Sequence, residues 1–167
     1  MVSEVNDMRN RVLPILGALW PYGIAGFWLL ANSPAAQFLQ DLFYPMLAFL
    51  LLAPVLAICG LIQGLRDTEA SPAALAGRSL AVKLAHIPFY GLVFFLFLIL
   101  PLGFAFFFIF DVLTMVVSGG FGIAAIVRAR RAGMLSNFQT ALHLIAHCLF
   151  VADVISAFLL WRKLKKA

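Results

Sequence analysis

The residues best suited to chemistry in this 167-residue chain lie near its carboxyl end. The stretch TALHLIAHCLFVAD, residues 140–153, places His143 and His147 four residues apart and Asp153 six residues further on. On a helix these residues and Gln139 fall within about 120° of one another. They therefore form one polar face in an apolar segment, and a histidine near a carboxylate can take up its proton.

A second polar stripe lies upstream, at spacings of three and four residues that share one face of a helix. Its members are Asp111, Thr114 and Ser118. If antiparallel helices carry the two faces, equal depth pairs Asp111 with Asp153 and Ser118 with His147. Two close carboxylates inside a membrane cannot both stay charged cheaply. Such groups mark ion or proton paths or specify helix packing, and both interpretations stay open.

No motif typical of an enzyme occurs in the chain. His143 and His147 have the spacing of two zinc ligands on one helix, but Leu-Ile-Ala lies between them and the glutamate of the HExxH pattern is absent. Cys59 and Cys148 lie singly in apolar segments and are predicted to be buried thiols. We therefore predict no catalytic residues, no metal and no cofactor, and expect a protein that is not an enzyme.

The composition indicates which solvent surrounds the helices that carry these residues. Hydrophobic residues make up 64% of the chain and charged residues 11%, whereas soluble domains have roughly 45–50% and about 25%. We therefore predict a single integral membrane domain over residues 1–167, located in the cell membrane, whose first partner is the lipid bilayer. The net charge of +5 does not indicate nucleic acid, because the basic residues cluster beside apolar segments, as in membrane orientation signals.

Apolar segments of about 20 residues predict an all-α bundle of five membrane-spanning helices. The prolyl turn Pro101-Leu102-Gly103 divides a long apolar stretch into two of them. Residues 66–83 form a cytoplasmic connection, in which Ser71 and Pro72 begin an interfacial helix. The predicted spans are residues 12–31, 42–65, 81–100, 104–127 and 138–161.

The distribution of basic residues orients the bundle but contains a conflict. Eight Lys and Arg residues, in the amino terminus, in residues 66–83 and in residues 128–131, fall on one side of five spans. Positive charge favours the cytoplasm, so the amino terminus is predicted to be cytoplasmic. The four basic residues of the carboxyl tail then fall on the other side. The alternative of four spans, with residues 138–161 interfacial or re-entrant, removes this conflict.

Small residues at helical spacing predict two faces for close helix contact. The first consists of Ala53, Ala57, Gly60 and Gly64, and the second of Ser118, Gly122, Ala125 and Ala129. Such faces pack helices within one chain or between chains. They motivate our first functional hypothesis, a non-enzymatic subunit or accessory that acts through helix contacts, with a membrane protein partner or as a homo-oligomer.

One short run carries a resemblance to known proteins. Residues 83–90, KLAHIPFY, enter a Phe-rich span, and this resembles small multi-span proteins of bacterial inner membranes that have no assigned role. The resemblance implies a polytopic membrane protein and no activity. Two further functional hypotheses stay open: a small transporter or ion- or proton-conducting protein that uses the intramembrane Asp and His residues, and a lipid-modifying membrane enzyme.

Overall fold

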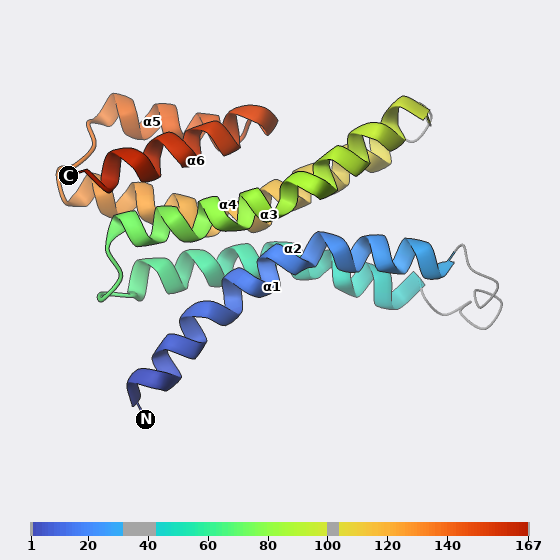
Figure 1. Cartoon of the computed structure of the whole chain (residues 1–167), viewed down its shortest axis with the longest axis horizontal. Coiled ribbons are helices and arrows are strands. Elements are labelled where there is room, and N and C mark those ends of the chain that lie inside the picture. Colours follow the sequence, from blue (N-terminus) through green and yellow to red (C-terminus); the bar gives the residue numbers. More distant parts are fainter. Residues whose placement is uncertain (1, 32–42, 100–103, 167) are drawn as a thin grey trace.

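The structure, a computed structural model, describes residues 2–31, 43–99 and 104–166 and has six helices in these ranges (Figure 1). The described residues contain no strand, which confirms the predicted all-α fold. The helices are α1 (Val2–Ala31), α2 (Phe43–Arg66), α3 (Pro72–Ile99), α4 (Phe104–Arg131), α5 (Asn137–Ala146) and α6 (Phe150–Leu164). The predicted turn at residues 101–103 lies outside the described residues.

Helix α4 lies at the centre of the molecule. It packs against α2 and α3, while α6 packs against α3, and α1 contacts both α2 and α3 (Figure 1). One apolar cluster joins α3, α4 and α6 through residues such as Leu75, Ile126 and Leu160. A second joins α1 to α4 around Trp20 and Phe110. The two clusters fix α4 between all of its neighbours.

Both small-residue faces pack within the chain. A Cβ atom at Gly64 would lie 2.6 Å from the Cβ of Ala124, and one at Gly120 would lie 2.3 Å from the carbonyl oxygen of Ala57. No real Cβ tolerates such distances, so glycine allows α2 and α4 to approach this closely. On the second face Ala125 and Ala129 are fully buried.

Helix α3 is longer than the sequence analysis predicts. It is continuous from Pro72 to Ile99, so the residues expected to form a separate interfacial helix are its first three turns. The predicted start is confirmed, because the Ser71 hydroxyl accepts a hydrogen bond of 3.1 Å from the backbone N–H of Ala74. Leu75 and Ala76 are buried, and this apolar face holds the first turns of α3 against the other helices.

The last predicted span, residues 138–161, is not one helix. The chain turns at His147, Cys148 and Leu149, and α5 and α6 lie side by side as an antiparallel hairpin (Figure 1). Thirteen residues of straight helix would hold His143 and Ser156 about 20 Å apart, whereas their side chains lie 2.8 Å apart. The structure therefore differs from the predicted bundle of five crossing helices, and it has the helical hairpin that a re-entrant segment would need.

Apolar side chains cover much of the outer surface. Among the described residues, the stretches Leu47–Arg66 of α2 and Phe108–Arg131 of α4 are long and apolar enough to cross a membrane. The α4 stretch is 65% buried and the α2 stretch only 22%, so the outward face of α2 consists of exposed apolar residues such as Leu51 and Val55. Cys59 and Cys148 are exposed, and the prediction that they are buried is wrong.

Candidate functional site: a buried ion pair

A buried ion pair joins α3 to the tip of the α5–α6 hairpin. Lys83 Nζ donates a hydrogen bond to a carboxylate oxygen of Asp153, Oδ2, and the two side chains are 0% and 1% exposed. Removing each charge from water costs several kcal/mol, and the attraction between the two ions offsets this cost only when the remaining donors and acceptors are also satisfied. The surroundings of the pair therefore decide what it can do.

Helix α4 supplies the second partner of Lys83. Lys83 Nζ donates a hydrogen bond of 3.1 Å to the hydroxyl of Ser118. The hydroxyl of Ser79, one turn before Lys83 on α3, donates to the backbone carbonyl of Ser118 at 3.0 Å. These contacts hold the lysine side chain between α4 and the first turn of α6.

The second carboxylate oxygen of Asp153 faces a histidine instead. His147 Nδ1 lies 3.4 Å from Asp153 Oδ1, which is too long for a good hydrogen bond. Both atoms, and His147 Nε2, are buried and have no hydrogen-bond partner among the described residues. A Cβ at Gly122 would lie 2.4 Å from Nε2, so glycine leaves room for the ring. Buried polar atoms without partners are rare and costly, so this half of the site is incompletely satisfied.

The break between α5 and α6 places both acidic and imidazole groups at the site. His147 caps the end of α5, and Asp153 lies in the first turn of α6. The positive end of the α6 helix dipole therefore stabilises the Asp153 carboxylate. We define the charge centre as Lys83, Ser118, His147 and Asp153. It contains one base, one acid and one cation within a region that the described residues close to water.

Two further polar pairs connect the hairpin helices. His143 Nδ1 and the Ser156 hydroxyl lie 2.8 Å apart, and Lys163 Nζ donates to Gln139 Oε1 at 2.5 Å. The predicted polar face of residues 139–153 is therefore present, but it is folded back on itself across the hairpin. His143 faces Ser156 of α6, and the ring of His147 lies between Asp153 of α6 and Gly122 of α4.

The upstream stripe has a different role from the predicted one. Ser118 enters the charge centre through its hydrogen bond from Lys83. His147, its predicted neighbour, has no hydrogen-bond partner at either ring nitrogen among the described residues. Thr114 is fully buried and donates to the Phe110 carbonyl of its own helix at 2.7 Å. The side chain of Asp111 lies outside the described part of the chain. The partners that the structure gives Asp153 are Lys83 and His147, because the hairpin places Asp153 at the level of Ser118.

Lys83 is the residue that the sequence analysis missed. The sequence predicts that Lys83 belongs to the charged connection of residues 66–83, although apolar residues flank it on both sides. A signal existed in the spacing: Ser79, Lys83 and His86 recur at steps of four and three and share a helix face. All three are buried. His86 Nε2 lies 2.9 Å from the carbonyl oxygen of Gly17 on α1.

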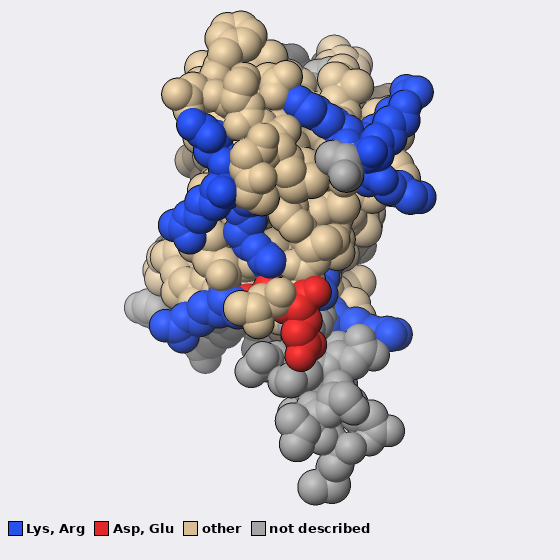
Figure 2. Space-filling model, turned by 90° about the vertical axis from the view of Figure 1, so that its left-hand side faces the viewer, with Lys and Arg blue, Asp and Glu red and all other residues tan. Residues whose placement is uncertain are grey.

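Nine of the other basic side chains gather at one end of the molecule, which we call the basic end. There α2, α4 and α6 end and α3 and α5 begin (Figure 1), and Figure 2 shows Lys and Arg around a small acidic cluster. Because α6 returns to this end, the carboxyl tail does not lie opposite the other basic segments as five crossing helices would require. The basic residues here are Arg66, Arg78, Arg128, Arg130, Arg131, Arg162, Lys163, Lys165 and Lys166.

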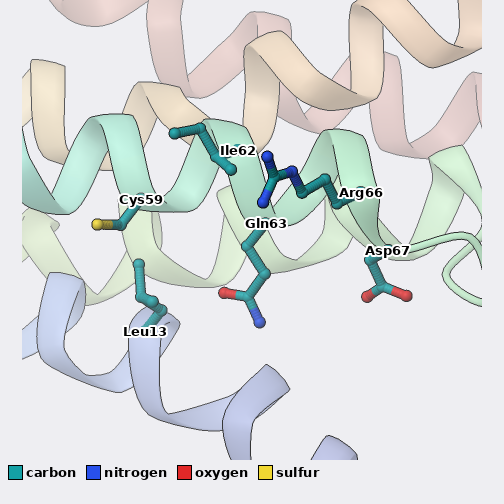
Figure 3. Close-up of a pocket in the computed structure, with 6 residues that line it drawn as sticks. All are labelled: Leu13, Cys59, Ile62, Gln63, Arg66 and Asp67. Atoms are coloured by element: carbon teal, nitrogen blue, oxygen red, sulfur yellow. The ribbon is translucent and has the colours of Figure 1, made fainter.

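Ion pairs and hydrogen bonds organise the basic end. Arg128 donates to the backbone carbonyls of Gly64, Asp67 and Ala70 and so fixes the α2–α3 connection on α4. Arg78 Nη1 lies 3.0 Å from Asp67 Oδ2. A cavity of about 290 Å³ opens beside this connection, between Leu13 of α1 and residues 59–67 (Figure 3). None of its lining residues belongs to the charge centre.

The described chain is therefore an all-helical protein with an ion pair buried between a helical bundle and a terminal hairpin. Residues 29–166 match the model of a family described as "Family of unknown function (DUF6652)", and the chain belongs to this family. The matched range contains the whole charge centre. No curated protein and no solved structure matches the chain.

Proposed function

We propose that the protein spans a membrane and carries protons through the charge centre, as a small proton-conducting or proton-coupled transport protein. The observation that carries this proposal is the Lys83–Asp153 pair beside His147, because a charged pair and an unsatisfied imidazole are costly inside an apolar protein. Ionisable residues in such positions typically mark ion or proton paths.

The outer surface supports a membrane location. Phe94 and Phe95 on α3 and Leu51 on α2 are each about 60% exposed. Each square ångström of apolar surface left in water costs about 25 cal/mol, and a bilayer removes this cost. The four long helices have 24 to 30 residues, or about 36–45 Å, which exceeds a hydrocarbon core of about 30 Å.

The hairpin then enters the membrane and returns. Helices α5 and α6 have 10 and 15 residues, or about 15 and 22 Å, and neither can cross about 30 Å of hydrocarbon. With four crossings and one re-entrant hairpin, both chain ends and the basic end face the cytoplasm, as the positive-inside rule requires. The conflict in the charge distribution then disappears.

The charge centre offers a simple sequence of proton transfers. A proton that arrives at His147 can be donated to Asp153 Oδ1, which lies 3.4 Å from Nδ1. Neutral Asp153 no longer balances the charge of Lys83. Lys83 can then pass a proton from Nζ to the oxygen of the Ser118 hydroxyl, its other hydrogen-bond partner, while Ser118 passes its own proton on to a water molecule that enters the site. Transfer from Asp153 to Lys83 restores the ion pair. One proton enters at His147 and one leaves from Lys83 in each cycle.

The small-residue faces that motivate the hypothesis of an accessory subunit make contacts within the chain. The small-residue faces are already used for contacts of α4 with α2 and with the charge centre. A lipid-modifying enzyme finds no support in the described side chains either, since the groups of the charge centre are closed off by their neighbours. Proton transfer needs only the titratable groups that the site contains.

Reconstituted protein provides the test. Purified protein is placed in liposomes that contain a pH-sensitive dye, and proton flux is driven by a pH gradient or a potassium diffusion potential. We expect flux above that of empty liposomes, and Asp153→Asn should reduce it about 100-fold, the range that a lost proton-transfer group costs. Asp67→Asn, which removes a carboxylate of the basic end that is also paired with an arginine, is the matched control and should retain the flux.

A folded variant without charge separates transport from stability. The double variant Lys83→Met with Asp153→Leu replaces the pair by apolar residues, a change that buried ion pairs often tolerate. If this variant keeps its helix content and thermal transition and loses the flux, the charge centre carries protons. Unchanged flux in the folded double variant, or wild-type flux no greater than that of empty liposomes under either gradient, would refute the proposal.

A further inference from the structure

Three polar pairs form a continuous row between α5 and α6, which we call the hairpin seam. Lys163 and Gln139 lie at the basic end, His143 and Ser156 lie in the middle, and His147 faces Asp153 at the tip. Gln139 and His143 on α5 and His147 at its C-terminal cap are four residues apart, or about 6 Å along the helix axis at each step. The seam therefore reaches from the basic end to the charge centre without an apolar interruption in this row.

The two walls of the seam are held very differently. Helix α6 is anchored by Ala157, Leu160 and Leu164, which are 1%, 0% and 3% exposed. Helix α5 has no buried residue. It contacts α4 as well as α6, and its partly buried Leu144 packs against the apolar cluster of α3, α4 and α6. The polar pairs join it to α6. Segments with few buried apolar contacts are those that open at least cost, so α5 is the wall that can move.

We infer that the hairpin seam is the route by which protons reach His147 and Asp153 from the basic end, with α5 as its movable wall. This inference rests on the proposed function and assigns roles to residues outside the charge centre. The hydrogen bond between Lys163 and Gln139 closes the mouth of the seam. His143 relays a proton between the mouth and His147, and the Ser156 hydroxyl orients its ring.

The electrostatic surroundings of His143 come from both helices. Lys163 on α6 and His147 on α5 are the titratable groups nearest along the seam, and Lys83 of α3 lies beyond His147 at the charge centre. On α4, the residue that approaches His147 is Gly122, which has no side chain. A proton on the seam therefore faces cations at both ends and one carboxylate, Asp153, which gives the route a direction toward the charge centre.

Thiol labelling in sealed membranes tests the route independently of flux. In a background with Cys59→Ser and Cys148→Ser, the variant Ser156→Cys carries a single thiol in the seam and is treated with a small membrane-impermeant cationic thiol reagent from each side. Ser136→Cys in the same background, exposed at the basic end, identifies the side of that end. Ile145→Cys, at a position that is 62% exposed on the outer face of α5, is the control for a position that faces lipid.

We expect the Ser156→Cys protein to be labelled only from the side that labels the Ser136→Cys protein, and the Ile145→Cys protein from neither side. We also expect Gln139→Ala to accelerate labelling of the thiol at position 156, because it removes the bond at the mouth. A static seam with only a structural role would leave position 156 unlabelled from both sides. That result, or labelling of position 156 from the opposite side alone, would overturn the proposed route.

Flux measurements then test the relay. His143→Phe fills the seam with an apolar ring and should reduce proton flux about 100-fold or more, as loss of a proton-transfer group does. Leu142→Phe, at a neighbouring exposed position of the same helix, is the matched control and should leave flux unchanged. His143→Gln, which keeps a hydrogen bond to Ser156 but cannot carry a proton, should behave like His143→Phe.

The outcomes separate the route from the function. If wild-type flux is present and Asp153→Asn abolishes it, while both His143 variants retain full flux, the charge centre carries protons by another route and the inference fails alone. If wild-type protein shows no flux, the proposed function fails and the route has no role to serve. Loss of flux in both His143 variants, with labelling of the Ser156→Cys protein from the basic end, supports both.

Discussion

Helix α4 presents two faces that use glycine for opposite purposes. Toward α2, Gly120 brings the helix into contact with the backbone of Ala57, and Gly64 of α2 lies against the Cβ of Ala124 on α4. Toward the hairpin, Gly122 leaves room for the imidazole of His147. The first face is closed by van der Waals contact between small groups. The second face borders a buried ion pair, beside which Asp153 Oδ1 and both ring nitrogens of His147 have no hydrogen-bond partner among the described residues.

This difference shows that the α2–α4 contact stabilises the bundle, whereas the charge centre is positioned by the bundle. At the α2–α4 face, Ala and Gly residues bring the helices together and the ring of Phe121 packs against Gly60. Among the described residues, the glycine contacts of this face involve no titratable side chain. The charge centre depends on Lys83, whose partners come from α4 and α6. A structure built only for packing would not need charges there, since apolar residues of similar volume usually serve as well. The rigid face therefore supports the polar one.

The largest effect should come from breaking the ion pair on one side only. Lys83→Met leaves the Asp153 carboxylate buried without its counter-charge, which costs about 3–5 kcal/mol. We expect a large fall in the thermal transition of the purified protein and a hairpin that proteases cleave more readily.

The same experiment includes its own control. The double variant Lys83→Met with Asp153→Leu should recover most of the lost stability, because no charge remains unpaired. A double variant as unstable as the single one would mean that the ion pair itself, and not the uncompensated charge, stabilises the junction.

A smaller loss of stability is expected from a substitution at the contact between α2 and α4. Gly120→Ala pushes a methyl group against the carbonyl oxygen of Ala57, a backbone atom that cannot move alone, and overpacking of this kind costs about 1–3 kcal/mol. Gly119→Ala is the matched control, since a Cβ there meets nothing within 4 Å. It should be neutral or stabilising by up to about 1 kcal/mol, because Ala favours helix. Equal transitions for the two variants would contradict the close approach of α2 and α4.

The contrast between the two faces also explains what could be predicted from sequence. The apolar segments predicted the all-α class and the approximate positions of α1 to α4. The small-residue spacing found both packing faces, because the steps of three and four residues are a local property of one helix. Gly60, Gly64 and Gly122 all lie at contacts between helices.

The hairpin could not be predicted in the same way. No Pro or Gly occurs between Asn137 and Leu164, so the usual signals for a turn are absent. The break at His147 to Leu149 depends on a distant residue instead. Asp153, just after the break, pairs with Lys83, which lies seventy positions earlier in the chain. From sequence, a single lysine within an apolar run is predicted to lie at a membrane surface. Only the tertiary packing shows that Lys83 is buried.

Removing the neutral partner of Lys83 should have a smaller effect than removing the charged one. Ser118→Ala deletes the hydroxyl that accepts a hydrogen bond of 3.1 Å from Nζ, while the bond to Asp153 remains. The net contribution of one hydrogen bond is about 1 kcal/mol, and we expect a loss of stability of this size by thermal unfolding. Ser118→Thr keeps the hydroxyl and separates loss of the bond from a change in volume. A loss as large as that of Lys83→Met would show that Ser118, and not Asp153, is the principal partner.

The smallest effect should come from the ion pair at the basic end, which water reaches. Burial raises the pKa of Asp67, but the backbone N–H of Ala70 and the guanidinium of Arg78 lower it by more, so its pKa lies below the ordinary value of 3.8. Because the folded pKa is depressed, its stabilising contribution is complete above the unfolded pKa of about 3.9 and is lost as the pH falls through the folded value. Asp67→Asn should therefore lower the free energy of unfolding by about 0.2–1 kcal/mol at pH 7, and should not change it at a pH below the folded pKa.

Glu69→Gln, a substitution at an exposed neighbouring position, should not change the free energy of unfolding at either pH. Thermal unfolding of the three proteins at both pH values measures the difference. A cost of Asp67→Asn at pH 7 as large as that of Lys83→Met would mean that burial does not distinguish the two ion pairs.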